Sequence, residues 1–433
     1  MLNVDFEALK NKLKASSTIR LTGKVKTVVG LTIEVEGLQA SVGEVCNVIT
    51  RHDMVPCEVV GFRDNALLLM PLDEISGVAS GCQVEATGKS LAVKVGDELL
   101  GCVLDGLGNT LDGRQLKENE EYPLQKKPPN PLNRKRITKI LSTGVRAIDG
   151  FLTCGEGQRL GIFAGSGVGK STLLGMIARY SDADVNVIGL IGERGREVKE
   201  FIEKDLGKDG LKKSVVVVAT SDQSALLRLK GAFTATSIAE YFRDKGLKVL
   251  LMMDSVTRFA MAQREVGLTI GEPPATKGYT PSVFAMLPKL MERSGTSDKG
   301  SITAFYTVLV DGDDMNEPIA DAARGILDGH IVLTRKLAEK NHYPAIDILA
   351  SISRLMSEIA DDKLKIKAGE LRDILATYNE SEDLINIGAY KKGSNTKIDR
   401  SINLIEPLNS FLKQGMMEHC PYNEMYNRIL SIE

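Results

Sequence analysis

Short alternations of apolar and polar residues, punctuated by glycine, run through the first ninety residues of the chain. The candidate strands are residues 23–29, 31–36, 43–50 and 55–70. The first two alternate on either side of Gly30 and are predicted to form a hairpin. Evenly spaced short strands of this kind predict a small β-barrel.

Ahead of these strands, residues 2–15 carry apolar side chains at spacings of four, three and four. They are Leu2, Phe6, Leu9 and Leu13. This spacing places them on one stripe of a short helix. The stripe either packs on its own domain or binds a partner helix, and the pattern fits both. We expect residues 1–90 to hold this helix and the barrel.

The pattern changes near residue 91, where apolar runs become continuous and alternate with helical segments. The candidate buried strands are residues 159–164, 185–191, 214–219, 248–253 and 302–310, with helices over 171–180 and 225–245. Continuous apolar strands are typical of parallel sheets covered on both faces, so an α/β doubly wound domain is predicted for residues 91–343. After about Tyr343 we expect no further strands, and residues 344–433 form a helical domain.

Composition narrows the functional classes. The net charge of −2 creates no general attraction to nucleic acid or an anionic membrane, and up to residue 90 only Phe6 and Phe62 could stack on RNA bases. Six scattered cysteines without a C-x-x-C pair indicate reduced thiols and no zinc site. The N-terminus does not resemble a signal peptide, and no apolar run approaches ~20 residues. We expect a cytoplasmic protein.

A proline-rich stretch over residues 123–131 predicts an extended connector, because proline removes backbone donors and restrains its predecessor. The basic run Arg134-Lys-Arg136 that follows is interpreted as a solvated face.

The segment Ala164-Gly-Ser-Gly-Val-Gly-Lys-Ser171 follows a predicted strand and opens a predicted helix. That context identifies a phosphate-binding P-loop, although Ala164 stands where the motif has its first glycine. Backbone N–H groups and the helix N-terminus would bind phosphates, Lys170 would reach the β- and γ-phosphates of ATP, and Ser171 would hold Mg²⁺. The candidate nucleotide-binding residues are Gly165, Ser166, Gly167, Val168, Gly169, Lys170, Ser171 and Thr172.

Two carboxylates follow neighbouring apolar runs. Asp254 ends the strand Val249-Leu-Leu-Met-Met253, and Glu193 follows the strand that ends near Ile191. Carboxyl ends of parallel strands face the ligand crevice, so Asp254 is a candidate Mg²⁺ ligand and Glu193 a candidate for orienting water. The alternative for Glu193 is a surface ion pair with Arg194 or Arg196.

These residues, with Thr143-Gly-Val-Arg-Ala-Ile-Asp149, Gly157-Gln-Arg159, Asp254-Ser-Val-Thr-Arg-Phe259 and Pro344-Ala-Ile-Asp-Ile-Leu-Ala-Ser-Ile-Ser353, resemble the ring ATPases related to the rotary ATP synthase. The resemblance covers nearly the whole chain and implies a RecA-like P-loop domain. It implies that Glu193 activates water, whereas non-catalytic subunits usually carry Gln there. It also implies that Arg354 reaches a neighbouring subunit's site as an arginine finger, with Arg194 and Arg258 near the γ-phosphate.

Within that family the chain most resembles the flagellar branch of the type III protein export ATPases. The stretches that carry this likeness are Phe259–Gly267, Gly271–Phe284 and Asp328–Leu333. The resemblance implies a homohexamer at the cytoplasmic face of the inner-membrane export apparatus, associated with the membrane only peripherally. Implied partners are a regulatory dimer at the N-terminal helix, a stalk protein, the export gate, export substrates and chaperones, with no nucleic acid.

Four other functions stay open at this point. They are a virulence-type type III secretion ATPase, a subunit of a rotary ATP synthase, a non-catalytic regulatory subunit that binds ATP without hydrolysing it, and an RNA-translocating ring. One feature is missing: the family is expected to place an aromatic residue on adenine shortly after the arginine, and the segment directly after Arg354, Leu-Met-Ser-Glu-Ile-Ala-Asp-Asp, has no ring. The adenine-binding residues are therefore unassigned, with Phe411 as a weak candidate.

Overall fold

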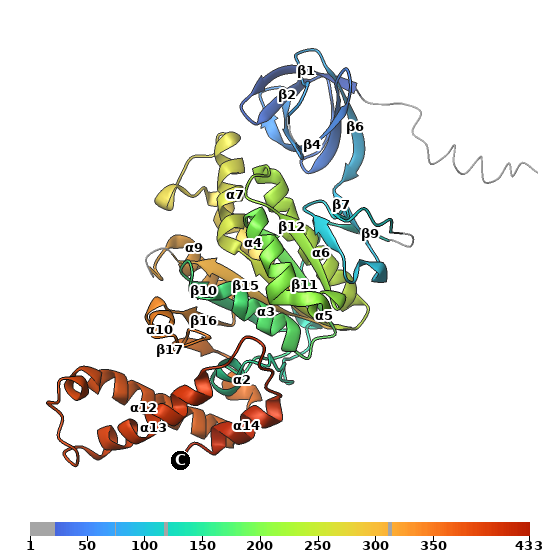
Figure 1. Cartoon of the computed structure of the whole chain (residues 1–433). Coiled ribbons are helices and arrows are strands. Elements are labelled where there is room, and N and C mark those ends of the chain that lie inside the picture. Colours follow the sequence, from blue (N-terminus) through green and yellow to red (C-terminus); the bar gives the residue numbers. More distant parts are fainter. Residues whose placement is uncertain (1–21, 74, 117–119, 311–313) are drawn as a thin grey trace, which may run out of the picture. The chain divides into compact units, whose positions relative to one another are not determined.

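The computed structural model describes residues 22–73, 75–116, 120–310 and 314–433 (Figure 1). These residues divide into two compact units, of which the second comprises Ala92–Glu265 and Pro273–Glu433. The first unit contains the β-strands that precede Leu91, together with Val266–Glu272. The helix predicted over residues 2–15 lies outside the described residues.

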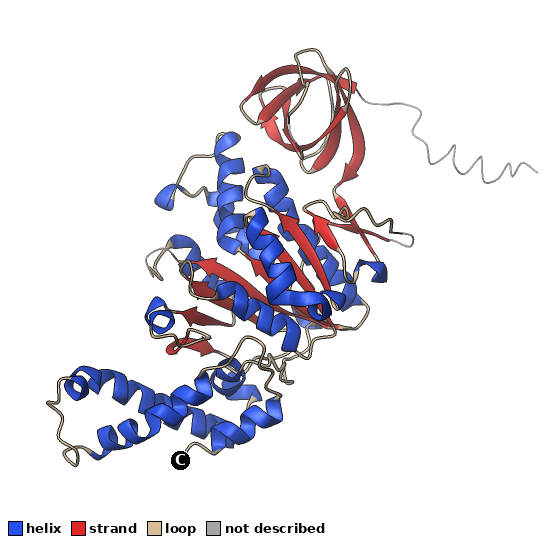
Figure 2. Ribbon diagram, viewed as in Figure 1, coloured by secondary structure: helices blue, strands red, loops and turns tan. Residues whose placement is uncertain are grey.

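The first unit contains a closed barrel whose strands are hydrogen-bonded in the order β1-β2-β5-β4-β3-β6 (Figure 2). Their bounds are β1 Thr22–Val29, β2 Thr32–Glu36, β3 Glu44–Ile49, β4 Met54–Arg63, β5 Ala66–Pro71 and β6 Gln83–Ser90. The β1–β2 hairpin turns at Gly30, where φ is +57°. Alternate side chains such as Val25, Ile33 and Val35 fill the interior, so the predicted small barrel is confirmed.

A nine-stranded sheet forms the centre of the second unit, in the order β17-β16-β10-β15-β13-β11-β12-β8, with β14 paired to β15. Its strands are β8 Val103–Asp105, β10 Arg159–Ala164, β11 Val185–Ile191, β12 Ser214–Ala219, β13 Lys248–Asp254, β14 Gly295–Thr296, β15 Ser301–Leu309, β16 Gly329–Leu333 and β17 Ile346–Ser353. Strands β8, β10, β11, β12, β13, β15 and β16 pair in parallel, whereas β17 runs antiparallel to β16. A separate ribbon pairs β7 (Ala92–Val95) with β9 (Glu120–Pro123).

All five predicted apolar strands are present, but the expectation that strands end near Tyr343 is wrong. Strand β17 lies beyond that residue and extends the sheet through its pairing with β16. Strand β16 was not predicted either. In both β16 and β17 the fully buried side chains are interrupted by partly exposed ones, and their pairing has an irregularity at residues 330–332. Neither therefore shows the continuous apolar run that marks a central parallel strand.

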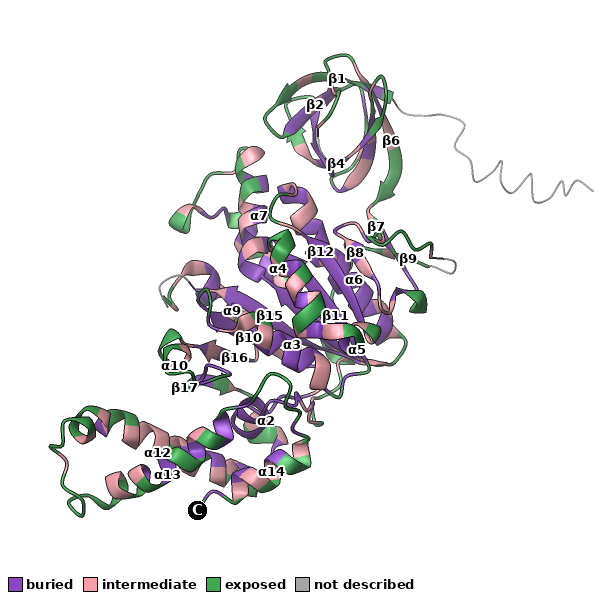
Figure 3. Cartoon of the chain, viewed as in Figure 1, coloured by how far each residue is buried: buried purple, intermediate pink, exposed green. Residues whose placement is uncertain are grey.

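Helices cover both faces of this sheet, as a doubly wound fold requires. The Asn186 amide donates to the Ala178 carbonyl of one helix, whereas Gly189 lies against Ala235 of another. Residues three apart on a strand point to opposite faces, so these helices lie on opposite sides. They are α3 (Lys170–Tyr180) and α6 (Ala225–Asp244). The strands between them are almost entirely buried (Figure 3).

The remaining helices are α2 Arg146–Phe151, α4 Gly195–Glu200, the π-helix η3 Phe201–Leu206, α5 Gly207–Lys212, α7 Val256–Thr269, α8 Pro281–Met291, α9 Pro318–Ile326, α10 Arg335–Glu339, α11 Met356–Ile359, α12 Asp362–Asn386, α13 Thr396–Leu412 and α14 Tyr422–Leu430. Three short 3₁₀ helices complete the described elements: η1 Asp97–Leu99, η2 Pro131–Asn133 and η4 Thr276–Gly278. Within the described residues, none of the helices combines the length and apolar character that a bilayer crossing demands.

The C-terminal helices share their core with the sheet domain through α2. The Arg146 side chain is almost fully buried and donates to the backbone carbonyls of Phe411 and Lys413. The same guanidinium pairs with the carboxylate of Glu418. Because a buried guanidinium needs partners for its donors, these contacts fix the loop between α13 and α14 against α2. Arg146 lies within the family motif noted above, and its contacts here are structural.

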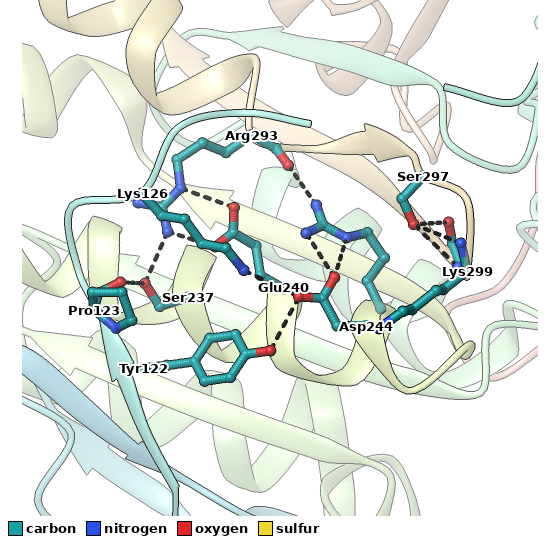
Figure 4. A network of polar contacts seen from close by, with 11 residues as sticks. Tyr122, Pro123, Lys126, Ser237, Glu240, Asp244, Arg293, Ser297 and Lys299 are labelled. Carbon is teal, nitrogen blue, oxygen red and sulfur yellow. Dashed lines mark hydrogen bonds and ion pairs between the residues drawn. The ribbon is translucent and has the colours of Figure 1, made fainter. Parts of the chain in front are cut away.

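The proline-rich connector is held to α6 by a polar network (Figure 4). Tyr122 and Lys126 each reach the carboxylate of Asp244 at 3.0 Å. Arg293 forms a fully buried ion pair with Glu240 at 2.8 Å and donates to the Leu124 carbonyl at 2.6 Å. The connector is therefore anchored at several points along its length.

The basic run after the connector differs from its interpretation as a solvated face. Arg134 donates to the Ser294 carbonyl at 2.8 Å and to the Glu292 carbonyl, and its side chain is only 20% exposed. Arg136, 79% exposed, pairs with Glu358 at the surface. The run was misjudged because backbone acceptors contributed by a distant turn cannot be seen in a sequence pattern.

We expect Arg293→Ala to lower the free energy of unfolding by about 3–5 kcal/mol, because it leaves the Glu240 carboxylate buried without its cation. Urea denaturation measures the change. The matched control is Lys212→Ala, which breaks an exposed pair with Asp209 and should cost at most about 1 kcal/mol. Equal losses for the two variants would show that the buried pair does not anchor the connector.

Candidate active site

The P-loop connects the carboxyl end of β10 to the first turn of α3. Gly167 and Gly169 adopt φ angles of +79° and +89°, a region that favours glycine over residues with a side chain. Gly169 immediately precedes the helix, whose first residue is Lys170. The sequence thus folds into a tight turn that points backbone N–H groups at one point, and such a turn can bind phosphate oxygens.

The two predicted carboxylates lie at the same edge of the sheet as the P-loop. Strand β13 ends at Asp254, which lies opposite Leu190 in the neighbouring strand β11. Glu193 follows the end of β11 by two residues. Since these strands and β10 are parallel, their carboxyl ends lie together and bring the three segments into one site.

The Lys170 ammonium joins these segments. Its Nζ lies 2.5 Å from Oδ1 of Asp254 and 3.5 Å from Oε1 of Glu193. Thr307 of β15 donates its hydroxyl proton to the same Asp254 oxygen at 2.7 Å. The exposed fractions of the three charged side chains are 13% for Lys170, 5% for Asp254 and 17% for Glu193. The alternative ion pair of Glu193 with Arg194 or Arg196 is absent from the ion pairs formed by the described residues.

Burial and neighbouring charges shift the pKa values of Lys170 and Glu193. Burial lowers the pKa of Lys170, but the carboxylates of Asp254 and Glu193 outweigh it, so its pKa is raised and the ammonium stays protonated. Burial raises the pKa of Glu193 to about 7, with the charge of Asp254 adding to the rise and Lys170 opposing it. A carboxylate with a pKa near neutrality is well suited to accept a proton from water.

The residues predicted to bind Mg²⁺ are compatible with such an ion. Oδ1 of Asp254 accepts both described hydrogen bonds, from Lys170 and Thr307, and Oδ2 accepts none among the described residues. Ser171, in the first turn of α3, is exposed. A carboxylate oxygen and a hydroxyl are the hard ligands that Mg²⁺ prefers, with phosphate oxygens and water completing its shell.

The two further arginines occupy different surroundings. Arg194 is 80% exposed and pairs with Glu197 at 3.5 Å. Arg258 of α7 is half-buried and packs its side chain so closely against Gly192 that a β-carbon there would lie 2.7 Å from Cβ of Arg258. Arg258 is therefore next to the turn that carries Glu193, and its Nε has no hydrogen-bond partner among the residues that the structure describes. Their roles at the γ-phosphate stay predictions.

Arg354 lies at the opposite edge of the sheet from the P-loop. Its backbone N–H donates to the Asp328 carbonyl at 3.0 Å, and the Asp328 N–H donates to the carbonyl of Arg159 at 2.8 Å. Arg159 is the first residue of β10, whereas the P-loop follows the last. Six strand residues span roughly 20 Å. The structure therefore does not bring Arg354 together with Lys170, Glu193 and Asp254 of the same chain.

One residue that the sequence reasoning missed lies against the P-loop. The ring of Tyr343 is 42% exposed, and its Cδ1 and Cε1 atoms lie 3.5 Å from the point that a β-carbon on Gly169 would occupy. Its backbone carbonyl accepts from Gln414 N–H at 2.9 Å. The signal that points to it is an aromatic residue immediately before the signature Pro344–Ser353, whereas the family resemblance places the aromatic residue after Arg354.

Phe411, the weak candidate for the adenine, does not face the site. Its ring is 4% exposed and makes an edge contact with Phe151, with the ring centroids 6.2 Å apart. It belongs to the core between α2 and α13. Tyr343, by contrast, presents a partly exposed aromatic ring beside the P-loop.

Family models match three successive parts of the chain. The beta-barrel domain of the ATP synthase alpha/beta family matches residues 25–88, and the nucleotide-binding domain of that family matches residues 144–353. The T3SS EscN ATPase C-terminal domain matches residues 360–431. The order of these matches follows the barrel, the parallel sheet and the C-terminal helices.

Relatives and solved structures agree over nearly the full length. A flagellum-specific ATP synthase from Bacillus subtilis is 56% identical and covers 98% of both chains, and a type 3 secretion system ATPase from Xanthomonas euvesicatoria is 51% identical over 98% and 97%. The assembled ATPase EscN of enteropathogenic E. coli is 46% identical, covers 95% of this chain and 99% of its own, and superposes with TM-scores of 0.90 alone and 0.88 in complex with its central stalk EscO. The chain belongs to the ATP synthase alpha/beta family, as an ATP-hydrolysing member related to the type III export ATPases.

Proposed function

We propose that the chain is the ATPase of a flagellar type III protein export apparatus, where ATP hydrolysis assists the unfolding and delivery of export substrates. Identity of 56% to a flagellar relative across 98% of both chains is the observation that carries this proposal. A virulence-type secretion ATPase is the second candidate, supported by the 51% identical relative. A rotary ATP synthase subunit is disfavoured because residues 360–431 match the type III C-terminal domain.

The P-loop and Lys170 bind the phosphates of ATP. An ammonium carries three donors, and Asp254 and Glu193 occupy two of them here, which leaves one for a phosphate oxygen. Ser171 and Asp254 would hold Mg²⁺, and the Thr307 hydroxyl fixes the Asp254 carboxylate by donating to its Oδ1. When bound, the ion neutralises charge on the β- and γ-phosphate oxygens.

Glu193 orients the attacking water and accepts its proton. Its carboxylate lies at the mouth of the site beside Lys170, where the γ-phosphate is expected. Desolvation makes the group a stronger base than an exposed glutamate, and Lys170 keeps it in place. Arg194 and Arg258 border the same turn and supply positive charge toward the γ-phosphate.

Each site is completed by a second copy of the chain. Arg354 lies roughly one strand length from its own P-loop and is exposed, with its guanidinium making one described contact, to the Arg324 carbonyl at 3.4 Å. A head-to-tail ring brings the amino edge of one sheet toward the carboxyl edge of the next, so Arg354 can stabilise charge on a neighbour's γ-phosphate. We propose a homohexamer with six such sites.

Tyr343 stacks on the adenine. A tyrosine ring beside Gly169 is within reach of a base whose phosphates occupy the P-loop, and it is exposed enough to be covered by one. The Gln414 N–H fixes the Tyr343 backbone from the C-terminal domain. The nucleotide is thus held at both ends by the same chain.

The partners are part of the same proposal. The complex of EscN with its central stalk supports a stalk protein as a partner of this chain. The export gate, export substrates and chaperones are proposed as further partners. A regulatory dimer would bind the predicted helix at residues 2–15. We place the protein in the cytoplasm, at the inner-membrane export apparatus and peripherally associated with it. Nucleic acid is not a proposed partner, since Phe62 is the one aromatic residue within the barrel strands β1–β6.

In a strain that lacks the gene, the chain should restore motility, whereas Glu193→Gln should not, because water would no longer lose its proton to this residue. Swimming and secreted flagellar protein are the measurements. The Glu203→Gln variant, which changes an exposed glutamate of η3, is the control and should restore motility. Full motility of the deletion strain would disprove the flagellar assignment.

The value of kcat/KM for ATP should fall as pH drops below about 7, with the slope of one proton. Glu193 has a raised pKa of about 7 in the free chain and must be ionised to accept a proton, so activity is retained above that pH and lost below it. Steady-state ATPase assays between pH 5.5 and pH 9 measure the profile. A profile without a break in this range would contradict the role of Glu193.

Tyr343→Ala should weaken ATP binding by about 1–3 kcal/mol, which is about 5- to 150-fold in Kd, through loss of base stacking. Tyr343→Phe keeps the ring and should bind nearly as well as the native chain. Titration with a fluorescent ATP analogue measures both variants. Weakening by the phenylalanine variant equal to that by alanine would exclude stacking as the contribution of this residue.

A further inference from the structure

The backbone of Arg354 rests on a buried amide that belongs to none of the catalytic groups. Gln158 lies immediately before β10 and is completely buried. Its amide nitrogen donates to the Asp328 carbonyl at 3.2 Å and to the Ser353 hydroxyl at 3.0 Å. Asp328 is the residue whose carbonyl also accepts the Arg354 N–H. The Gln158 side chain therefore fixes both Ser353 and the Asp328 carbonyl, which accepts the backbone N–H of Arg354.

Every polar atom of this amide is used. The Gln158 carbonyl oxygen accepts from the Gly155 N–H at 2.9 Å, so both of its ends are satisfied. The Ser353 hydroxyl, which accepts from Gln158, donates in turn to the Thr153 carbonyl at 3.0 Å. A fully satisfied buried network is rigid and specifies one local conformation.

Two further features fix the same point. Arg159 binds the Asp328 carboxylate with Nε at 3.1 Å and Nη2 at 3.2 Å, which is a bidentate pair. Gly329, the first residue of β16, approaches β17 so closely that a β-carbon on it would lie 2.4 Å from the Ile352 carbonyl oxygen and 3.0 Å from Cα of Ser353. We call Gln158, Asp328, Gly329 and Ser353 the Arg354 socket.

The contrast between backbone and side chain at Arg354 is informative. The backbone is held by the socket, whereas the exposed guanidinium has only the 3.4 Å contact to the Arg324 carbonyl among the described residues. A side chain that must reach a phosphate on another subunit needs a backbone held in one position and a guanidinium that its own chain leaves available. Displacement of a transition-state contact by about 1 Å can cost about 100-fold in rate.

We infer that Gln158 is a positioning residue for Arg354, acting through Ser353 and Asp328 on the active site of the neighbouring subunit. The inference rests on the proposed function, in which Arg354 acts in trans. Gln158 does not touch the nucleotide of its own subunit, because it precedes β10 and the P-loop follows β10. Its effect on hydrolysis should therefore appear at one of the two interfaces of each subunit and not at the other.

Mixed rings test this asymmetry. Subunits carrying Glu193→Gln still supply Arg354, and subunits carrying Arg354→Ala still supply Glu193. Each variant alone should be inactive, and the mixture should regain activity at the hybrid interfaces, about a quarter of the total in a random 1:1 mixture. The same mixture is then made with Gln158→Met added to one parent or to the other.

Gln158→Met in the Glu193→Gln parent should lower the regained activity about tenfold or more, through kcat with the KM for ATP unchanged. The same substitution in the Arg354→Ala parent should change it less than about twofold. Ser353→Ala, a smaller change that removes the hydroxyl of the socket, should show the same asymmetry and replaces Gln158→Met if that chain does not enter rings.

The outcomes distinguish a failure of the shared site from a failure of the positioning role of Gln158. If the parental mixture regains no activity, the shared site itself is wrong. If the mixture is active but both placements of Gln158→Met lower its activity equally, Gln158 serves only the fold and the inference is overturned. Loss confined to the Arg354→Ala parent would overturn it as well.

Discussion

The parallel direction of the central strands is the constraint on which the site depends. Parallel strands present all their carboxyl ends at one edge, so the P-loop after β10, Glu193 after β11 and Asp254 at the end of β13 must converge there. Arg354 lies at the opposite, amino edge, because β17 runs antiparallel to β16 and returns the chain to that edge. In the proposed function, one chain therefore carries two incomplete parts of a site on opposite edges of one sheet.

Charge pairing explains why two carboxylates and a lysine can lie together at the carboxyl edge of the sheet. Two carboxylates would repel each other in a largely buried site, and Lys170 stabilises both, at 2.5 Å from Asp254 and 3.5 Å from Glu193. Burial, and after it the charge of Asp254, nevertheless raise the pKa of Glu193, the carboxylate farther from the cation. The ammonium that would bind phosphate is thus also a group that limits the rise in the pKa of the proposed base.

The sequence was most informative where local rules suffice. Continuous apolar runs predicted the five central strands, and the glycine pattern predicted the P-loop turn and the barrel, since each depends on neighbouring residues. Strands β16 and β17 were missed because their partners determine them. Contacts made over long separations were equally hidden, such as Arg134 with Ser294 and the ring of Tyr343 beside Gly169. Arg146, quoted for the family likeness, proved to be a buried anchor for the C-terminal helices.

The central claim is that hydrolysis takes place at a site shared by two chains. A structure of the assembled ring with ADP and a γ-phosphate transition-state analogue tests it most directly. The account predicts that the Arg354 guanidinium lies within hydrogen-bonding distance of the analogue bound to the neighbouring P-loop, with Lys170, Glu193 and Asp254 of that neighbour around it. An analogue fully enclosed by one chain, with Arg354 of the neighbour beyond contact, would contradict the account.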